Sequence, residues 1–495
     1  MSKINAKHIK NINENTRSKT LIIPVLKVEN FVVDLLDDNA NKLFSETLKN
    51  EDLGSNGEIN VLHTPNSLFP EFGYLRIFCI GLGNLADSDV SSVRRSAGNL
   101  GRYFLNSKIE EVNIFTDSFE LFNEKETMIE GFLEGFFLGN YSFDKYKNKK
   151  SSTNNFFEIT NSNPKVEISN VMKKSIETSN AEKTARNLVN EPANFLTPTE
   201  LAKFAQNLSN KKLKCKILGK DECEKLGMNA FLGVAQGSVE EPKLIHLSYK
   251  PLPEKQSFWY IGKAITFDSG GLSLKPSGSM FSMKGDMGGA ASVISAIDAI
   301  ANLNLKVNID VLCLATENMP SGSAQRPSDV VKSMDGTYIE VENTDAEGRL
   351  TLADAITYAK GFDPKFIIDI ATLTGAASIG LGKGNISAFS NDPKFMKEVI
   401  NAGESSGDYV WELPLDSVSK KQNNSSVADI KNTGGRLAGT ITAAHFINHF
   451  VGDTPWVHLD IAANSMTSSS DGWHNKGATG IPTRLLIELA YIFEK

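Results

Sequence analysis

Short apolar runs alternate with segments of helical spacing after residue 190, and this alternation restricts the folds that the chain can adopt. Five runs are apolar almost throughout, as expected for strands that are buried on both faces of a sheet: residues 244–249, 258–261, 311–315, 366–372 and 457–461. Segments with helical spacing lie between several of them, notably residues 290–301 and 350–359. The pattern predicts an α/β sandwich around a central sheet that is mostly parallel or mixed.

The first part of the chain shows the same two kinds of signal and predicts a smaller α/β domain. Buried strands are expected at residues 20–25 and 75–80, and helices at residues 93–105 and 128–138. Residues 147–163 are rich in Asn, Ser and Lys, which predicts a surface loop or linker. We therefore expect three parts: an N-terminal domain over residues 1–165, a linker helix over residues 166–190 and a larger domain over residues 191–495.

Composition and charge exclude several classes of protein. With 495 residues, of which 40% are hydrophobic and 22% charged, the chain has the composition of a folded globular protein. Its net charge of −7 argues against nucleic acid as a general partner. The four cysteines are far apart and form no C-x-x-C pair, which favours free thiols in a reducing compartment.

The sequence contains no segment typical of secretion or of membrane insertion. The first 20 residues are positively charged, but no apolar segment follows them. The longest apolar runs, such as residues 366–373, are far shorter than the roughly 20 residues that a membrane span needs. We therefore expect a cytoplasmic protein that does not associate with a membrane.

Charged side chains gather in glycine-rich turns that follow the expected strands. These turns are residues 262–271 (GKAITFDSGG), residues 283–289 (MKGDMGG) and residues 343–349 (NTDAEGR). Ligands of α/β proteins collect beyond the carboxyl ends of the strands, so these turns are the expected place for chemistry. The candidate side chains there and beside them are Lys263, Asp268, Lys275, Asp286, Asp345, Glu347 and Arg349.

Each of these residues also has a purely structural interpretation. Asp268 could hold a turn, and Asp286 could cap the helix that follows it. Asp345 and Glu347 could complement the dipole of a first helical turn, and the basic residues could be solvated charges. Four carboxylates in one place would repel one another, however, unless positive charge lay among them.

Two divalent cations explain the whole group of residues better than separate structural roles do. Hard cations prefer oxygen ligands, and two of them would neutralise four carboxylates. A lysine amine could complete one coordination sphere, because a nearby cation lowers the pKa of a lysine. A remaining lysine and an arginine would then be free to stabilise negative charge on a substrate. This charge balance is the one required for two-metal hydrolysis.

The same segments closely resemble the cytosolic leucyl aminopeptidase family, whose members are two-metal aminopeptidases. NTDAEGR, GKAITFDSGG and SLKP (residues 273–276) carry the resemblance at matching intervals. Further matching segments are residues 190–192 (NEP), 317–320 (ENMP), 369–375 (DIATLTG), 432–438 (NTGGRLA) and 476–480 (KGATG). The resemblance covers the C-terminal half, whereas the N-terminal 165 residues are similar only in length and in the stretch that begins at Gly135.

The resemblance implies a set of metal ligands. Asp268 and Glu347 match the carboxylates that bridge the two metals. Lys263, as an unprotonated amine, and Asp286 match the remaining ligands of one metal. Asp345 matches the ligand of the other metal, through its side chain and its backbone carbonyl. The expected cofactors are therefore two divalent ions per subunit, Mn²⁺ or Zn²⁺.

The resemblance also implies catalytic and substrate-binding residues. Lys275 matches the lysine that polarises the scissile carbonyl and stabilises the oxyanion, and Arg349 matches the arginine that holds a bicarbonate ion. Met283, Thr372 and Gly375 match the pocket for the first side chain of the peptide, which would favour apolar residues such as leucine. The expected reaction is hydrolysis of the N-terminal peptide bond by a metal-activated water.

The resemblance implies a homohexamer, and two other functions stay open. One is a two-metal phosphoesterase, although such sites often recruit histidine and none lies near these motifs. The other is an additional role as a DNA-binding regulator, which the net acidity of the chain disfavours.

Overall fold

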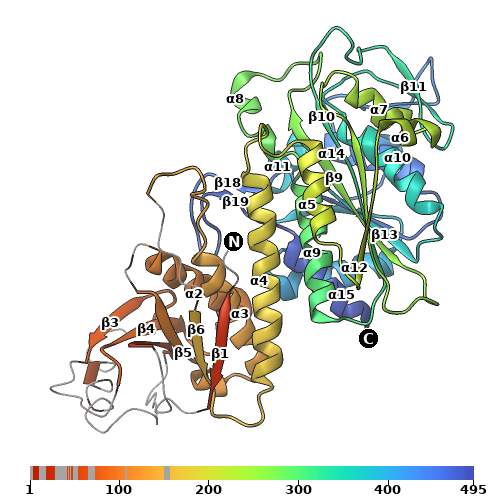
Figure 1. Ribbon diagram of the computed structural model, residues 1–495. Helices are drawn as coiled ribbons and strands as arrows, with labels where there is room; N and C mark the ends of the chain where they lie inside the picture. Colours follow the sequence, from red (N-terminus) through yellow and green to blue (C-terminus); the bar gives the residue numbers. More distant parts are fainter. Residues whose placement is uncertain are drawn as a thin grey trace. The chain divides into compact units, whose positions relative to one another are not determined.

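The computed structural model divides the chain into two compact units (Figure 1). It describes residues 4–10, 18–27, 42, 44, 46, 47, 54–64, 73–105, 107, 109–149 and 156–494. The first unit comprises Met1–Lys183 and Thr467–Lys476, and the second comprises Thr184–Met466 and Gly477–Lys495. Helix α4, Ile168–Asn190, begins in the first unit and ends in the second.

The first unit is built on a six-stranded sheet in the order β1-β6-β5-β2-β4-β3. Its strands are β1 Asn5–Ile9, β2 Thr20–Leu26, β3 Ile59–His63, β4 Arg76–Gly83, β5 Glu111–Phe115 and β6 Phe156–Thr160. Strand β3 is antiparallel to β4, and the other neighbours are parallel. Helices α2 (Val90–Phe104) and α3 (Lys125–Gly139) pack closely at Gly98 and Gly139. A β-carbon on Gly139 would lie only 2.0 Å from the carbonyl oxygen of Gly98, so this approach requires glycine. The two strands and two helices expected here are confirmed.

Strand β6 contradicts the expected loop over residues 147–163. Its residues pair in parallel with β1 on one side and with β5 on the other, so β6 is an inner strand of the sheet. Phe157 and Ile159 are fully buried. The surface-loop prediction is wrong for residues 156–160. The short apolar run there lies between flanks rich in Asn and Ser, so the composition of the whole stretch indicated a loop. Residues 150–155 of the expected loop lie outside the described residues.

The second unit contains an eight-stranded mixed sheet in the order β15-β14-β17-β13-β9-β10-β8-β7. The four central strands, β17, β13, β9 and β10, are parallel, and antiparallel pairs join β14 to β17 and β8 to both β10 and β7. The strands are β7 Leu213–Leu218, β8 Lys243–Tyr249, β9 Phe258–Asp268, β10 Ile309–Asn318, β13 Phe366–Ala371, β14 Ile386–Ser390, β15 Val410–Glu412 and β17 Trp456–Asp460. All five strands expected from the apolar runs are present, and the predicted α/β fold class is confirmed.

Helices cover both faces of this sheet (Figure 1). On one face lie α9 (Gly288–Leu303), α12 (Pro393–Ser406) and α15 (Thr483–Glu494), and a second group consists of α7 (Asn229–Ala235), α10 (Gly348–Lys360) and α14 (Gly439–Val451). Successive residues of a strand point to opposite faces. In β9, Ile261 belongs to the core cluster that contains Leu350 of α10, whereas Gly262 faces α9, where its β-carbon would lie 2.6 Å from Ala290.

Shorter elements complete the second unit. The Thr197 side chain accepts a hydrogen bond from the backbone N–H of Glu200 and caps helix α5 (Pro198–Asn207), which has a proline at its first position. A small sheet, β11-β12-β16, lies apart from the central one in the pairing scheme. The remaining elements are α5 Pro198–Asn207, α6 Lys220–Lys225, α8 Ser277–Met280, η2 Met283–Gly285, α11 Gly375–Leu381, α13 Ser417–Lys420, η3 Lys421–Asn423, β11 Val330–Lys332, β12 Tyr338–Glu340, β16 Ile430–Lys431, β18 Met466–Thr467 and β19 Gly477–Ala478, together with η1 Asp117–Leu121 of the first unit.

Candidate metal centre

Strand β9 carries two of the candidate ligands itself. The sequence suggests that the strand ends at Ile261, but β9 continues to Asp268, so Lys263 lies within the strand and Asp268 is its last residue. The expected end of the strand is therefore wrong. The strand continues because its parallel partner β10 pairs with it as far as Asp268, whereas pairing with β13 ends at Gly262.

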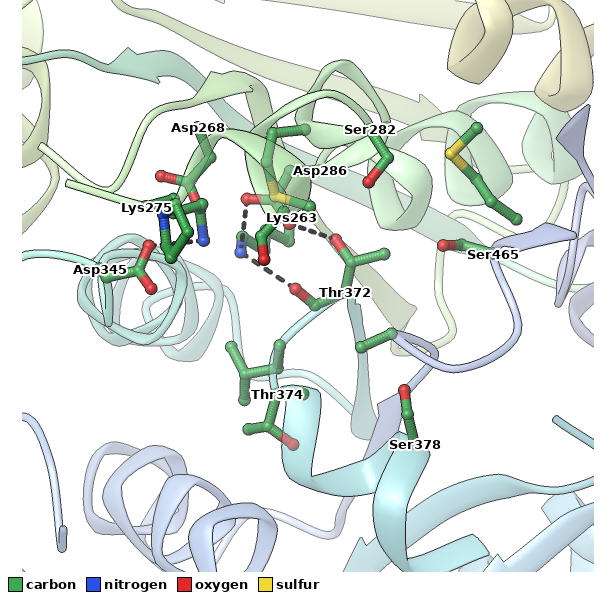
Figure 2. A pocket seen from close by; sticks show the side chains of 18 residues that line it. Lys263, Asp268, Lys275, Ser282, Asp286, Asp345, Thr372, Thr374, Ser378 and Ser465 are labelled. Carbon is green, nitrogen blue, oxygen red and sulfur yellow. Dashed lines mark hydrogen bonds and ion pairs between the residues drawn. The ribbon is translucent and has the colours of Figure 1, made fainter. Parts of the chain in front are cut away.

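A pocket of about 380 Å³ opens at the carboxyl ends of the central strands (Figure 2). Its walls include eight of the ten sequence-predicted site residues: Lys263, Asp268, Lys275, Met283, Asp286, Asp345, Thr372 and Gly375. These residues come from β9, from the segment that follows it, from the turn before α10 and from the residues that follow β13. Residues more than 100 positions apart in the sequence thus meet at one edge of the sheet, as expected for an α/β fold.

Lys263 lies at the centre of three carboxylates. Its Nζ is 2.7 Å from Asp286 Oδ2 and 2.7 Å from Glu347 Oε1. Carboxylate oxygens of Asp268, Asp286 and Glu347 all lie within 4.8 Å of one another, and the three residues are buried. Lys263 Nζ also donates to the backbone oxygen of Thr372 at 3.1 Å, so the amine is held from several directions (Figure 2).

Lys275 forms a second contact group next to the first. Its Nζ is 2.7 Å from Asp268 Oδ2 and 2.5 Å from Asp345 Oδ1. Asp268 therefore belongs to both groups, because its oxygens face Lys275 and also lie near Asp286 and Glu347. The arrangement is a continuous chain of carboxylates and ammonium groups at the end of β9.

The electrostatics of the cluster show a shortage of positive charge. Burial raises the pKa of Asp286 well above its usual value, and the neighbouring carboxylates of Glu347 and Asp268 add to this effect. Burial and Glu347 likewise raise the pKa of Asp268, and burial raises that of Asp345. Burial alone would lower the pKa of Lys263, but the surrounding carboxylates outweigh it and raise that pKa. Two ammonium groups thus face four carboxylates, and additional cationic charge would stabilise the site.

Backbone and amide groups fix the orientation of the carboxylates. Asp268 Oδ1 accepts from Asn318 Nδ2 at 2.8 Å and from the backbone N–H of Gly270 at 2.9 Å. The register of β9 and β10 places Asn318 directly beside Asp268. Asp286 Oδ1 accepts from Thr372 Oγ1 at 2.7 Å. Sequence reasoning missed Asn318 as a functional residue, although it lies in the ENMP segment, because an uncharged amide carries no signal of its own.

Arg349 and Glu347 mark the beginning of helix α10. Glu347 occupies the N-cap position, and Arg349 lies in the first turn. Arg349 Nη1 donates to the backbone oxygen of Asn432 at 2.7 Å, while its Nε has no hydrogen-bond partner among the described residues. Burial lowers the pKa of Arg349 to about 10. In the described structure, neither Glu347 nor Arg349 is among the residues that line the pocket.

One wall of the pocket is held by a buried carboxylate in β17. Asp460 Oδ1 accepts from the backbone N–H of Leu373 at 3.2 Å, and its Oδ2 accepts from Thr374 Oγ1 at 2.7 Å. This fixes the segment from Thr372 to Gly375, which lines the pocket (Figure 2).

Comparisons with known proteins agree with this architecture. The model of the cytosol aminopeptidase family catalytic domain matches residues 183–487, and the N-terminal domain model of the same family matches residues 25–150. A probable cytosol aminopeptidase of Clostridium tetani is 41% identical over 468 residues, which cover 92% of this chain and 95% of the relative. Another, from Brucella melitensis biotype 1, is 45% identical over 365 residues, covering 72% of this chain and 75% of the relative.

A solved structure shows the same fold. The bottromycin maturation enzyme BotP, in complex with Mn, is 28% identical and superposes with a TM-score of 0.85. The match covers 97% of this chain and 100% of that one.

The fold and the site define a two-unit α/β protein with a buried carboxylate cluster suited to divalent cations. The chain belongs to the cytosol aminopeptidase family and is a metallo-exopeptidase, as the sequence motifs predict. Within the described residues, no helix is both long enough and apolar enough to cross a membrane.

Proposed function

We propose that this protein holds two divalent cations at the end of β9 and releases N-terminal residues from peptides, favouring apolar residues such as leucine. The observation that carries the proposal is the convergence of Asp268, Asp286 and Glu347, whose carboxylate oxygens lie within 4.8 Å of one another. We further propose that residues 191–495 form the catalytic domain and that the helix over residues 166–190 links it to an N-terminal domain over residues 1–165.

The residues present fit a pair of such ions. Asp268 and Glu347 would contribute to both sites, Lys263 and Asp286 would complete one of them, and Asp345 would serve the other. Asp286 Oδ2 and Glu347 Oε1 are buried and, within the described residues, have no neighbour that satisfies them except the Lys263 ammonium group. A cation bound there would lower the pKa of Lys263 and allow its neutral amine to serve as a ligand.

When bound, such ions act as Lewis acids that polarise the scissile carbonyl and acidify the attacking water. In the proposed mechanism Lys275 donates from Nζ to the oxyanion that develops on the carbonyl carbon. Burial alone would lower the pKa of Lys275, but the carboxylates of Asp268 and Glu347 outweigh burial and raise that pKa. Lys275 is therefore protonated and able to donate.

Arg349 is proposed to hold a bicarbonate ion, which would supply a general base to the site. A buried guanidinium with Nε unpartnered among the described residues supports anion binding, because a charged donor left unsatisfied is costly. Mn²⁺ or Zn²⁺ is proposed as the native metal, since oxygen ligands with one amine accommodate either ion. The complex of BotP with Mn is consistent with manganese.

The proposed pocket for the first side chain of the peptide is the space between Met283 and the Thr372–Gly375 wall. Met283, Leu373 and Met466 give it an apolar lining, whereas Ser378 and Ser465 add hydroxyl groups (Figure 2). Apolar first residues therefore fit the pocket, with leucine as the expected preference.

We propose a homohexamer in the cytoplasm with peptides as substrates and without nucleic-acid or membrane partners. The names of the relatives, which are probable cytosol aminopeptidases, support this location. Sedimentation of the purified protein tests the assembly, and a hexamer has six times the 54.1 kDa mass of the chain.

A panel of aminoacyl p-nitroanilides tests the reaction, with chelator and then with Mn²⁺ or Zn²⁺ added back. We expect leucine p-nitroanilide to be cleaved fastest, chelation to stop cleavage and either metal to restore it. Equal turnover of charged and apolar residues would contradict the specificity. Hydrolysis of p-nitrophenyl phosphate would favour the phosphoesterase, and a DNA gel shift at physiological salt would reveal a regulatory role.

A further inference from the structure

We propose that Asn432 is a positioning residue that holds the backbone around Asp345 in the shape required for metal binding. The proposal rests on the proposed two-metal function. Asn432 opens the NTGGRLA segment, and none of the roles described above involves its side chain. It is completely buried, although an asparagine is normally exposed unless its amide is satisfied.

The small sheet brings Asn432 to the metal-ligand segment. Strand β16 pairs in parallel with β12, with Glu340 opposite Lys431. The backbone N–H of Asn432 extends this ladder by donating to the carbonyl oxygen of Glu340 at 2.9 Å. The side chain of Asn432 therefore lies along the residues that follow β12, which lead to Asp345 and Glu347.

The Asn432 side chain uses its full hydrogen-bonding capacity on that segment. Its Oδ1 accepts from the backbone N–H groups of Glu342 at 2.9 Å and Asn343 at 3.3 Å. Its Nδ2 donates to the backbone oxygens of Asn343 at 2.7 Å and Ala346 at 3.2 Å. A side-chain amide has two donors and an acceptor oxygen with two lone pairs, so this geometry is specific for asparagine.

These bonds hold the backbone on both sides of Asp345. Asn343 precedes Asp345 and Ala346 follows it, and the backbone N–H of Asp345 is itself held by Asn343 Oδ1 at 2.8 Å. The Asp345 side chain extends to Lys275 at the pocket. The main-chain oxygen of Asn432 also accepts from Arg349, so one residue orders a proposed metal ligand and the proposed anion-binding arginine.

The test compares Asn432→Ala and Asn432→Asp with a matched control, Asn308→Ala. Asn308 is 2% exposed and holds the loop over residues 252–255 through its side-chain amide. Its Nδ2 donates to the backbone oxygens of Leu252 at 2.5 Å and Lys255 at 2.7 Å, and its Oδ1 accepts from the backbone N–H of Leu252 at 3.0 Å. It directly precedes β10 and thus lies at the amino end of the strand, whereas Asn318 and the site lie at the carboxyl end. Asn432→Asp keeps the size and an accepting oxygen but loses both donors.

Mn²⁺ binding to metal-free protein is measured by the electron paramagnetic resonance signal of the free ion, and unfolding is followed without metal. We expect both Asn432 variants to bind at least one Mn²⁺ about 10-fold more weakly or worse, in line with other residues that orient metal ligands. Excess Mn²⁺ should restore part of their kcat. Asn308→Ala should lose stability and keep the wild-type Mn²⁺ affinity.

Three results would overturn the proposal: Mn²⁺ affinities of both Asn432 variants within twofold of wild type, an equal loss of affinity in Asn308→Ala, or failure of both Asn432 variants to fold while Asn308→Ala folds. If only Asn432→Ala fails to fold, the Mn²⁺ affinity of Asn432→Asp alone decides between the proposal and a purely structural role. Wild-type protein that binds neither Mn²⁺ nor Zn²⁺ would instead contradict the proposed two-metal function.

Discussion

Gly348 leaves no room for a β-carbon beside Lys263. A β-carbon on Gly348 would lie 2.5 Å from Lys263 Cε and 2.8 Å from its Nζ. Gly348 is the first residue of α10 and directly follows Glu347, so the helix can begin next to the amine only because this position has no side chain. The glycine of the NTDAEGR segment thus has a steric role in the site.

Replacing Gly348 with alanine should therefore displace Lys263. We expect Gly348→Ala to lower kcat/KM by roughly 10²-fold, because a shift of about 1 Å in a catalytic site has an effect of this size. Gly322→Ala is the control, since a β-carbon there meets no atom within 4 Å. Steady-state kinetics of the two variants provide the comparison, and similar kinetics for both would show that the Lys263 amine tolerates the displacement.

Asp345→Asn should reduce metal occupancy and abolish turnover. The substitution removes a negative charge from a site where four carboxylates face two ammonium groups, and an amide is a weaker ligand for a divalent ion. Metal content per subunit and hydrolysis of leucine p-nitroanilide are the measurements. Asp329→Asn, at a surface ion pair with Arg326, is the control for the loss of one charge. Full activity of Asp345→Asn without bound metal would contradict its assignment as a ligand.

Lys275→Ala should lower kcat by roughly 10²–10³-fold with metal content intact, by analogy with the loss of an oxyanion donor. The Lys275 side chain contacts Asp268 and Asp345, both of them proposed metal ligands, so a role at the oxyanion has to be separated from a role at the metal site. Metal analysis of the purified variant separates them. If the variant loses its ions along with its activity, Lys275 serves the metal site and not the oxyanion.

Stability should fall with rising pH because of Asp354, a buried carboxyl group of α10. Burial raises the pKa of Asp354 to about 7, although its oxygens accept from the backbone N–H groups of Phe231 and Met334. A carboxyl group with a raised pKa in the folded state binds more protons there than in the unfolded state. The contribution of Asp354 to the free energy of unfolding is thus most favourable below about pH 4 and declines as the pH rises to about 7.

Between pH 5.5 and 7.5 the decline from Asp354 should amount to roughly 2 kcal/mol in the free energy of unfolding, at about 1.4 kcal/mol per pKa unit. Urea unfolding of wild type and Asp354→Asn at several pH values measures it. Between these two pH values, the free energy of unfolding of Asp354→Asn should decline by about 2 kcal/mol less than that of wild type. This difference does not depend on the absolute stability of the variant. Parallel curves for the two proteins would mean that Asp354 does not titrate in this range.

Removal of metal should lower stability without unfolding the protein. Lys263 and Lys275 contact the carboxylates at 2.5 to 2.7 Å, so their ammonium groups would partly replace the charge of a removed ion. Added Mn²⁺ should stabilise the folded state by about 2.7 kcal/mol per site at 100 times its dissociation constant. Calorimetry with and without Mn²⁺ tests this, and a chelated protein with no cooperative transition would contradict it.

Much of the fold and the site could be predicted from the sequence, because the relevant signals are local. A run such as residues 366–372 is apolar on both faces only if the strand is buried between helices. Charged side chains in glycine-rich turns at Asp268, Asp286 and Asp345 are hard to explain without a function, and the structure places them in one pocket.

The tertiary structure alone decided which uncharged groups serve that pocket and how far the strands extend. β9 reaches Asp268 because β10 pairs with it that far, and β6 is an inner strand because β1 and β5 flank it. The role of Asn432 depends on pairing with a strand about 90 residues earlier. An amide has no charge that reveals its partners in a sequence, because its contribution is set entirely by the donors and acceptors that the fold places around it.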